Sequence, residues 1–374
     1  MRIAFIGQKG IPASVSSRAG GVERHVEGLS ERLAQRGHTV TVYCRPYMNP
    51  ERKKHWKKVR LITLPTIERK NFDTIFHSFL ATIHVLFQPV DVIHYHSVGP
   101  STLAWIPRVF KPGVRVVATF HARDRFHEKW RWPARVFLAF GEWAICHFPH
   151  VTITVSHGLQ LYCQKMHGRD AVHIPNAVVV PSNKMGASKI LDLGLQKDGY
   201  FILLGRLIPV KAFDDAIRAF KKVETKKKML IVGDVSFDSL PYKIKLETLA
   251  DDDERVILTG FRKGKELQEL LANCYAMIHP ARSEGLSMAV LEAMSYGKLV
   301  IMSNIQGNRE LVDHSGIAYP VGNISALQDA IEWVISDPIL THIRGKRAKK
   351  VVKDLYSWDR LIERTESVYK RPIL

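Results

Sequence analysis

Two glutamates, Glu284 and Glu292, are separated by a spacing that suggests a binding site. Glu284 follows an apolar run with the pattern of a strand, and Glu292 lies on a helix predicted from Met288 to Ser295. Eight residues are a little over two helical turns, so both side chains would lie on similar sides of the helix axis. Surface helices also carry such pairs by chance, but the apolar residues around Glu292 favour a site. Carboxylates accept hydrogen bonds from hydroxyl groups, so the pair predicts binding of a sugar or a ribose.

Two cations, Arg206 and Lys211, follow the strand predicted at Phe201–Gly205. In open α/β sheets, ligands bind at the carboxyl ends of the strands. Arginine offers a planar pair of donors and lysine a compact charge, so the two could neutralise a pyrophosphate. The alternative is two ordinary surface cations.

A glycine-rich loop, Gln8–Gly21, follows the first predicted strand and ends in Gly20 and Gly21 before a helical pattern. Backbone N–H groups at such a helix start can bind a phosphate. The loop does not match the G-x-G-x-x-G pattern of dinucleotide-binding proteins. A flexible loop without a ligand is the alternative here.

The elements that position these residues form two series of short strands separated by helical stretches. The first series is predicted at Ile3–Gly7, Thr39–Cys44, Arg60–Leu64, Val92–His96, Val114–Phe120 and Val151–Ser156. The second is predicted at Phe201–Gly205, Met229–Gly233, Arg255–Thr259, Ala276–His279, Leu299–Met302 and Gly316–Ala318. Strands that alternate with helices predict parallel sheets. We therefore expect an α/β protein of two facing, Rossmann-like, doubly wound domains with a cleft between them.

The domain boundaries follow from composition. We expect a first domain at residues 1–175, a linker at 176–198 that is rich in Gly, Ser, Asn and Lys, and a second domain at 199–357. Residues 358–374 are predicted to form a C-terminal helix that packs back on the first domain.

The order of these motifs resembles that of retaining glycosyltransferases of family 4 (group 1), which have the GT-B fold. The Gly20-Gly21 loop, Arg206-x4-Lys211 and Glu284-x7-Glu292 carry the resemblance, which covers nearly the whole chain. It implies an acceptor-side first domain and a second domain that binds a nucleoside-diphosphate sugar. It further implies that no cofactor is needed, because the nucleotide sugar is a co-substrate.

Roles for single residues also come from the resemblance. The amide of Gly21, and that of Gly20 as well, would contact donor phosphates, while Arg206 and Lys211 would stabilise the leaving nucleoside diphosphate. Glu284 would bind hydroxyls of the transferred sugar, and Glu292 the ribose. The remaining implied contacts are the amides of Leu286, Ser287 and Met288 at the donor, His121 near the reacting carbon, and Arg262 at the base pocket.

Two positions depart from the family pattern. Ser287 stands where many relatives have glycine, and Asn304–Glu310 resembles the usual glycine-rich turn only loosely. Both leave the identity of the donor open.

The resemblance implies transfer of a sugar to a hydroxyl acceptor with retention of configuration and without a metal ion. Asp251–Glu254 has the D-x-D spacing of metal-dependent transferases, but we interpret it as a solvated acidic loop. We also placed His94 and His96 on opposite faces of a strand, so that at most one would line the site.

Charge is concentrated in the first half of the chain. Residues 1–175 hold 25 Lys and Arg against 11 Asp and Glu, a net charge of +14 out of +19. Such a field attracts anionic partners. Cations alternate with aromatic residues in Arg123–Arg135, as at a membrane interface. Peripheral contact with an anionic membrane through the first domain is therefore a hypothesis, and a buried aromatic cluster is the alternative.

The sequence also gives expectations for the cellular location of the protein and for its acceptor. Four scattered cysteines and the absence of an apolar leader at Met1–Gly7 predict a cytoplasmic protein, peripheral at the inner face of the plasma membrane. The acceptor would be a sugar, a glycolipid or a lipid-linked saccharide in cell-surface polysaccharide or glycolipid synthesis.

Two other functions are retained as alternatives. An NAD(P)-dependent oxidoreductase would share Rossmann-like units, although the chain lacks G-x-G-x-x-G followed by an acidic residue. A basic nucleic-acid-binding protein would explain the charge but leaves the Glu pair unexplained, so no nucleic acid is expected as a partner.

Overall fold

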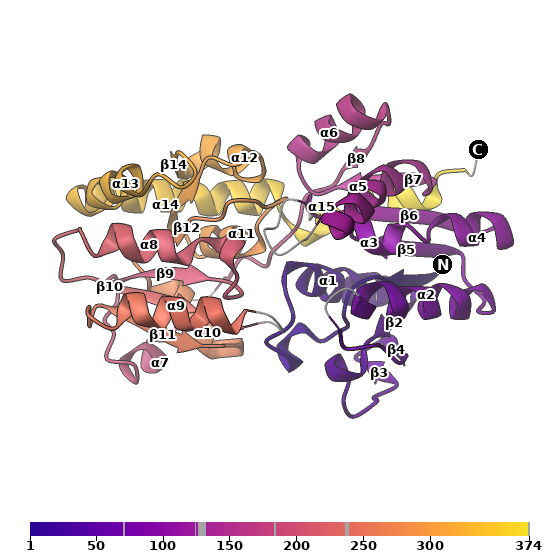
Figure 1. Cartoon of the computed structure of the whole chain (residues 1–374), viewed down its shortest axis with the longest axis horizontal. Helices are drawn as coiled ribbons and strands as arrows, with labels where there is room; N and C mark the ends of the chain where they lie inside the picture. Colours follow the sequence, from indigo (N-terminus) through magenta and orange to yellow (C-terminus); the bar gives the residue numbers. More distant parts are fainter. Residues whose placement is uncertain (70–71, 124, 126–131, 183–184, 236–238, 373–374) are drawn as a thin grey trace. The chain divides into compact units, whose positions relative to one another are not determined.

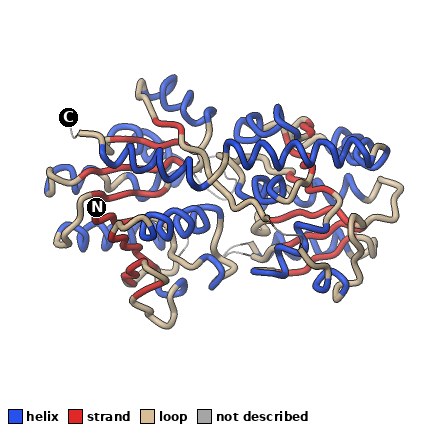
Figure 2. The backbone as a smooth tube through the Cα atoms, turned by 180° about the vertical axis from the view of Figure 1, so that it is seen from behind, coloured by secondary structure: helices blue, strands red, loops and turns tan. Residues whose placement is uncertain are grey.

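The computed structural model describes residues 1–69, 72–123, 125, 132–182, 185–235 and 239–372, without the side chains of residues 313–315. Contacts divide the chain into two compact units. The first unit comprises Met1–Asn176 and Trp358–Leu374, and the second comprises Ala177–Ser357. Both are parallel-sheet α/β domains, as expected, and Figure 2 shows helices on the faces of each sheet.

The first unit contains an eight-stranded sheet in the order β3-β4-β2-β1-β5-β6-β7-β8. All its pairs are parallel except β3–β4, which is an antiparallel pair at the sheet edge. Its strands are β1 (Arg2–Ile6), β2 (Thr39–Cys44), β3 (His55–Trp56), β4 (Val59–Thr63), β5 (Val92–His96), β6 (Arg115–Phe120), β7 (Val151–Thr154) and β8 (Val172–His173). The central strands β5 and β6 are buried at every position, which fits their nearly continuous apolar runs.

Helices cover this sheet (Figure 1). They are α1 (Gly21–Gln35), α2 (Phe72–Leu86), α3 (Val98–Ser101), α4 (Trp105–Phe110), α5 (Trp132–His147), α6 (His157–His167) and α15 (Trp358–Lys370), with 3-10 turns η1 (Ala13–Val15) and η2 (Pro46–Met48).

The second unit contains a six-stranded parallel sheet in the order β11-β10-β9-β12-β13-β14. Its strands are β9 (Tyr200–Leu204), β10 (Lys228–Val232), β11 (Val256–Gly260), β12 (Ala276–His279), β13 (Leu299–Ser303) and β14 (Ile317–Tyr319). Its helices are α7 (Ser188–Leu191), α8 (Phe213–Phe220), α9 (Leu240–Ala250), α10 (Gly264–Asn273), α11 (Met288–Ser295), α12 (Gln306–Ser315), α13 (Ile324–Ser336) and α14 (Pro338–Leu355), with the 3-10 turn η4 (Pro209–Lys211). Residues 177–198 contain α7 and pack within this unit, where Lys189 N donates to Glu269 Oε2 at 2.7 Å.

Each sheet has one point at which the strand order reverses. In the first unit the chain leaves β1 toward β2 and later resumes on the other side of β1 with β5. In the second unit it leaves β9 toward β10 and resumes on the other side of β9 with β12. Loops on the two sides of such a point run in opposite directions, which opens a crevice at the carboxyl ends of the strands. These points are where ligand sites are expected.

The last described helix, α15, belongs to the first unit although the whole second unit precedes it in the chain. The Trp358 ring packs on Gly28 of α1 so closely that a Cβ at Gly28 would lie 2.2 Å from it. At the other end of the helix, Tyr369 Oη is 2.7 Å from His94 Nδ1. The first unit is therefore completed by a segment distant in sequence.

Our assignment of His94 and His96 to opposite faces is wrong. Residues two apart in a strand point to the same face. The two rings stack with centroids 4.3 Å apart, and both are buried.

None of the helices in the described ranges combines the length and apolar character needed to cross a membrane.

Candidate active site

The strand-order reversal of the second unit holds a pair of opposite charges. Lys211 ends η4, after β9, and Glu284 lies in the loop after the neighbouring strand β12. Lys211 Nζ donates a hydrogen bond to Glu284 Oε1, and the two side chains are only 13% and 19% exposed. Two residues predicted separately from sequence are thus brought into contact. Charges with this little exposure interact more strongly than exposed ones, because water screens them less.

His279, the last residue of β12, lies behind this pair. Its Nε2 is 3.9 Å from Glu284 Oε1, and its ring is buried. Burial, reinforced by the Lys211 charge, lowers the pKa of His279 to about 3. The imidazole is therefore neutral near pH 7, and the fixed charges of the site are those of Lys211 and Glu284.

Gly307, near the start of α12, fixes the loop that carries Glu284. A Cβ at this position would lie 2.4 Å from the carbonyl oxygens of both Glu284 and Gly285. Any side chain would push the loop away, so glycine is required by close approach. By sequence, Asn304–Glu310 resembles the family's glycine-rich turn only loosely, and the pattern alone does not predict this requirement.

The other residues predicted for donor binding lie around the same edge of the second unit. Ser287 is the N-cap residue of α11, and Met288 is its first residue. Glu292 follows one turn later on that helix, and Leu286 is buried just before it. Arg206 comes directly after Gly205, which adopts a φ of 157°.

Arg262 and the acidic loop are engaged in other contacts. Arg262 Nη1 donates to Glu266 Oε1 at 2.8 Å, four residues along the chain. In the acidic loop, Asp253 pairs with Arg255 at 2.8 Å, and Asp252 with Lys221.

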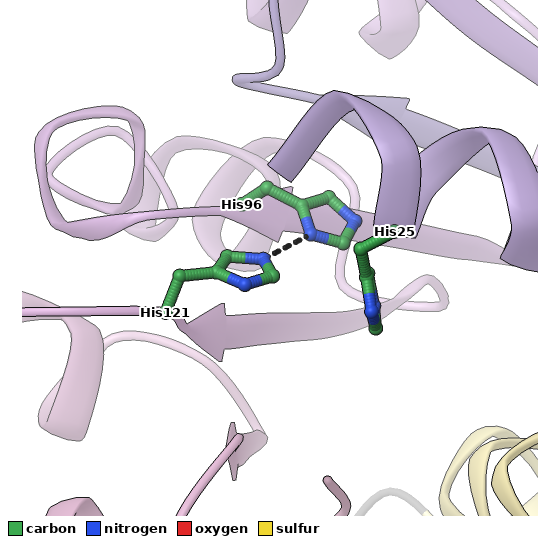
Figure 3. Close-up of side chains that lie close together, drawn as sticks. All are labelled: His25, His96 and His121. Atoms are coloured by element: carbon green, nitrogen blue, oxygen red, sulfur yellow. Dashed lines mark hydrogen bonds between the residues drawn. The ribbon is translucent and has the colours of Figure 1, made fainter. Parts of the chain in front are cut away.

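The strand-order reversal of the first unit holds three histidines. His96 ends β5, His121 directly follows β6, and His25 is on α1. His96 Nδ1 lies 3.0 Å from His121 Nε2, and these two rings stack at 5.3 Å. The His25 ring stands edge-on, 5.1 Å from the His121 ring, so the three imidazoles converge (Figure 3).

All three histidines are buried, and His121 is the most open at 8% exposure. Burial lowers the pKa of His25 to about 4 and holds the pKa values of His96 and His121 well below the usual range. Neighbouring histidines lower the pKa values of His96 and His121 further. The cluster is therefore neutral near pH 7, in contrast to the charged pair of the second unit.

Gly20 and Gly21 lie at the start of α1, where Gly20 is the N-cap residue. The Gly20 amide donates to Glu23 Oε2 at 2.7 Å, and Glu23 Oε1 accepts from Lys9 N at 3.0 Å. The amide of Gly20 is thus already bonded within its own helix start. Its expected contact with a phosphate would require this carboxylate to release it.

Three residues of these sites were not predicted from the sequence: His25, His96 and His279. His25 lies in an ordinary helical pattern that gives no signal. His96 was set aside by the wrong assignment of faces, and His279 looked like the end of an apolar strand. For His96, alternation along the strand would have been a sufficient signal.

Comparisons with known proteins identify the family of the chain. Residues 19–180 match the family described as Glycosyltransferase Family 4, and residues 192–351 match Glycosyl transferases group 1. The chain therefore belongs to the group 1/family 4 glycosyltransferases and has the GT-B fold.

Relatives with curated names include a phosphatidylinositol N-acetylglucosaminyltransferase gpi3 subunit from Schizosaccharomyces pombe. It is 25% identical over 94% of this chain and 77% of its own length. The N-acetyl-alpha-D-glucosaminyl L-malate synthase of Bacillus anthracis is 28% identical over 43% of this chain and 42% of its own.

Solved structures support the fold. Sucrose-phosphate synthase from Thermosynechococcus elongatus superposes with a TM-score of 0.86 at 21% identity, covering 99% of this chain and 98% of that one. HepE from Anabaena, solved in complex with UDP-glucose, gives 0.80 at 19% identity, covering 99% and 100%. The enzyme class is that of glycosyltransferases, so the oxidoreductase and nucleic-acid-binding alternatives are set aside.

Proposed function

We propose that this protein transfers a sugar from a nucleoside-diphosphate sugar to a hydroxyl acceptor and retains the anomeric configuration. The observation that carries the proposal is the contact between Lys211 and Glu284 at the strand-order reversal of the second unit. A cation for phosphate beside an acceptor for hydroxyl groups matches the two chemical parts of a nucleotide sugar. A relative in fold, HepE, is named as a complex with UDP-glucose, which further supports this donor class.

In this function, the second unit binds the donor. Lys211 and Arg206 neutralise the pyrophosphate, while Glu284 accepts hydrogen bonds from hydroxyls of the transferred sugar. Glu292 binds the ribose, and Arg262 lines the base pocket. The amides of Leu286, Ser287 and Met288, at the start of α11, face the sugar and phosphates, as helix N-termini commonly do.

The chemical step breaks the bond between the anomeric carbon and the phosphate oxygen. The acceptor hydroxyl oxygen forms a bond to the same carbon on the same face, and its proton goes to the departing phosphate oxygen. Lys211 and Arg206 stabilise the charge that develops on that phosphate. The transfer therefore needs no metal ion and no cofactor besides the nucleotide sugar.

His121 contributes as a neutral group of the first unit. Its depressed pKa keeps it uncharged near pH 7, so it can exchange a hydrogen bond with a sugar hydroxyl near the reacting carbon without adding a charge. The Gly21 amide at the start of α1 is proposed as a further phosphate contact.

The test is a screen of nucleotide sugars followed by analysis of the product. We expect saturable binding of UDP or GDP in calorimetry, no binding of NAD, and turnover that persists in EDTA. Proton NMR of the glycoside formed should show the donor's anomeric configuration. Inversion of that centre would contradict the mechanism, and a lack of binding by every nucleoside diphosphate would contradict the donor class.

We further propose that the acceptor is a sugar, a glycolipid or a lipid-linked saccharide presented at an anionic membrane, as in cell-surface polysaccharide or glycolipid synthesis. Helix α5 supports this proposal because it exposes an apolar face: Trp132, Val136, Phe137, Phe140 and Trp143. The exposures range from 40% to 76%, and the residues recur at helical spacing. Arg135 lies beside them, whereas Arg123 packs over the Tyr162 ring and Arg125 pairs with Glu142; residues 124 and 126–131 lie outside the described part. A cation next to exposed aromatic residues suits an anionic lipid surface.

Vesicle flotation tests the membrane contact. We expect binding to vesicles with anionic phosphatidylglycerol and weak binding to pure phosphatidylcholine. The double variant W132S/F140S should lose binding, while I339S, which removes an exposed apolar residue of α14 in the second unit, should keep it. Equal binding by both variants would contradict the assignment to α5.

A further inference from the structure

The histidine cluster of the first unit consists of His25, His96 and His121. One nitrogen atom from each ring can be chosen so that all three lie within 4.8 Å of one another. In the described part of the chain, Nδ1 of His25 is buried without a hydrogen-bond partner. Leaving a buried polar atom unpaired is costly and calls for a reason.

We propose that these three imidazoles form a binding site for a divalent transition-metal ion of the Zn²⁺ type, with a fourth coordination position open. The ion is not a participant in the transfer. It competes with the reaction, because it takes a ring nitrogen of His121.

The geometry requires only small adjustments. Zinc binds histidine nitrogens at about 2.0–2.1 Å in tetrahedral sites, so ligand nitrogens should be roughly 3.4 Å apart. His96 Nδ1 and His121 Nε2, at 3.0 Å, would separate slightly. The His25 ring would approach by about an ångström, which a modest side-chain rotation provides.

Contacts of the neighbouring His94 hold the cluster in place and show why His94 is not itself a ligand. His94 stacks on His96, and both of its nitrogens are already bonded, Nδ1 to Tyr369 Oη and Nε2 to Thr119 Oγ1, each at 2.7 Å. His94 therefore supports the His96 ring and is not a ligand.

The donor set selects the kind of ion. It contains three imidazoles and neither a carboxylate nor a thiolate, which suits Zn²⁺, Co²⁺, Ni²⁺ or Cu²⁺ and not Mg²⁺ or Ca²⁺. The rings are neutral near pH 7, so the ion does not have to displace protons from imidazolium groups. His121, which directly follows β6, is buried but is the most exposed of the three at 8%, so an ion would enter on its side.

Metal binding is tested on the full-length protein without any sugar. Addition of Co²⁺ to EDTA-treated protein should produce the visible absorption of a four-coordinate site with one equivalent, and Zn²⁺ should bleach it. His25→Gln and His96→Gln should each weaken Zn²⁺ binding in calorimetry by about 10-fold or more, since each removes a ligand. His55→Gln, which changes an exposed histidine of the same unit, is the control.

Loss of a metal ligand can be distinguished from misfolding of a variant. X-ray absorption of the 1:1 zinc complex of the unaltered protein should show three imidazoles, which requires no variant to fold. Fewer than three imidazoles, or equal Zn²⁺ binding by the unaltered protein and a folded His25→Gln variant, would overturn the proposal.

The expected inhibition of sugar transfer by Zn²⁺ rests on the proposed function, in which His121 contacts the sugar. We expect Zn²⁺ to lower transfer with the same concentration dependence as its binding. If Zn²⁺ binds at the cluster but transfer is unaffected, the metal site stands and the role of His121 at the sugar is wrong.

Discussion

The two units place different electrostatics at equivalent positions of similar scaffolds. Where the strand order reverses in the first unit, three neutral histidines converge; in the second unit, Lys211 and Glu284 meet as full charges. Burial depresses the histidine pKa values, whereas Lys211 and Glu284 form an ion pair. The sheets thus determine where a site forms, and the residues at the ends of the strands determine which groups it contains. On the proposed function, the second unit would neutralise the donor phosphates, and the first would present neutral histidines near the sugar.

The largest effect that would sharpen this comparison is expected from Lys211→Ala. Removing the cation breaks the ion pair with Glu284 and leaves the leaving phosphate without this counter-charge, so kcat/KM should fall by about 100- to 1000-fold. Affinity for the free nucleoside diphosphate should fall as well, which calorimetry measures. Lys222→Ala, at an exposed position of the same unit, should change neither. Full activity of Lys211→Ala would contradict the proposal that Lys211 of the second unit neutralises the leaving phosphate.

A second effect distinguishes the stability of the two units in acid. Among the described residues, histidines with lowered pKa values number nine in the first unit and one, His279, in the second. Those in the first unit are His25, His77, His84, His94, His96, His121, His150, His167 and His173.

The direction in which stability changes with pH follows from the difference in proton binding between the folded and unfolded chain. Above pH 6.5 a histidine such as His25 is neutral whether the chain is folded or unfolded, so it makes no difference to stability. As the pH falls from 6.5 toward the folded pKa of about 4, only the unfolded chain takes up the proton, and stability is lost. For His25 alone the loss by pH 4 is roughly 3 kcal/mol.

Urea unfolding at pH 7 and pH 4, followed by tryptophan fluorescence, measures this loss. The signal reports the first unit, since Trp333 is the only tryptophan within residues 177–357. The His25→Gln variant should lose less stability between the two pH values than His55→Gln does. An equal loss would mean that His25 is not buried as a neutral group.

A smaller effect on activity is expected from His121→Ala. Loss of one neutral contact near the reacting carbon should lower kcat by about 10- to 100-fold, because such a contact acts on orientation and not on phosphate charge. Binding of the nucleoside diphosphate should stay unchanged, in contrast to Lys211→Ala. Weakened nucleotide binding by His121→Ala would contradict the proposal that only the second unit binds the nucleotide.

The smallest effect concerns the packing of α15 on the first unit. Gly28→Ala places a methyl group against the Trp358 ring and should lower the free energy of unfolding by roughly 1 to 2 kcal/mol. Gly113→Ala is the matched control, because a Cβ there meets no atom within 4 Å. Thermal denaturation of the two variants measures the difference. Equal stability would show that Trp358 moves aside without cost.

Much of the fold was predictable because buried parallel strands have nearly continuous apolar sequences. The strand predicted at Ala276–His279 agrees with β12, and the helix predicted at Met288–Ser295 agrees with α11. The short edge strands β3 and β8 were missed, since two residues give no periodic signal.

The candidate sites were predictable only in part. Lys211 and Glu284 each follow a strand, and adjacent strands bring their ends together, so sequence position was informative. His25 depends on how α1 is rotated above the sheet, which tertiary packing decides. The requirement at Gly307 arises from a backbone 22 residues away in sequence, at Gly285, and no local pattern encodes it.

The position of α15 has a consequence for the order of events during synthesis. Residues 177–357 are synthesised between the two segments of the first unit, so the first unit cannot be completed before the whole second unit has been made. Until then, His94 has no hydroxyl from Tyr369 and the groove over Gly28 is uncovered. The second unit is thus built from one continuous segment of the chain, whereas the first, which carries the histidine cluster, is completed only when the chain returns to it.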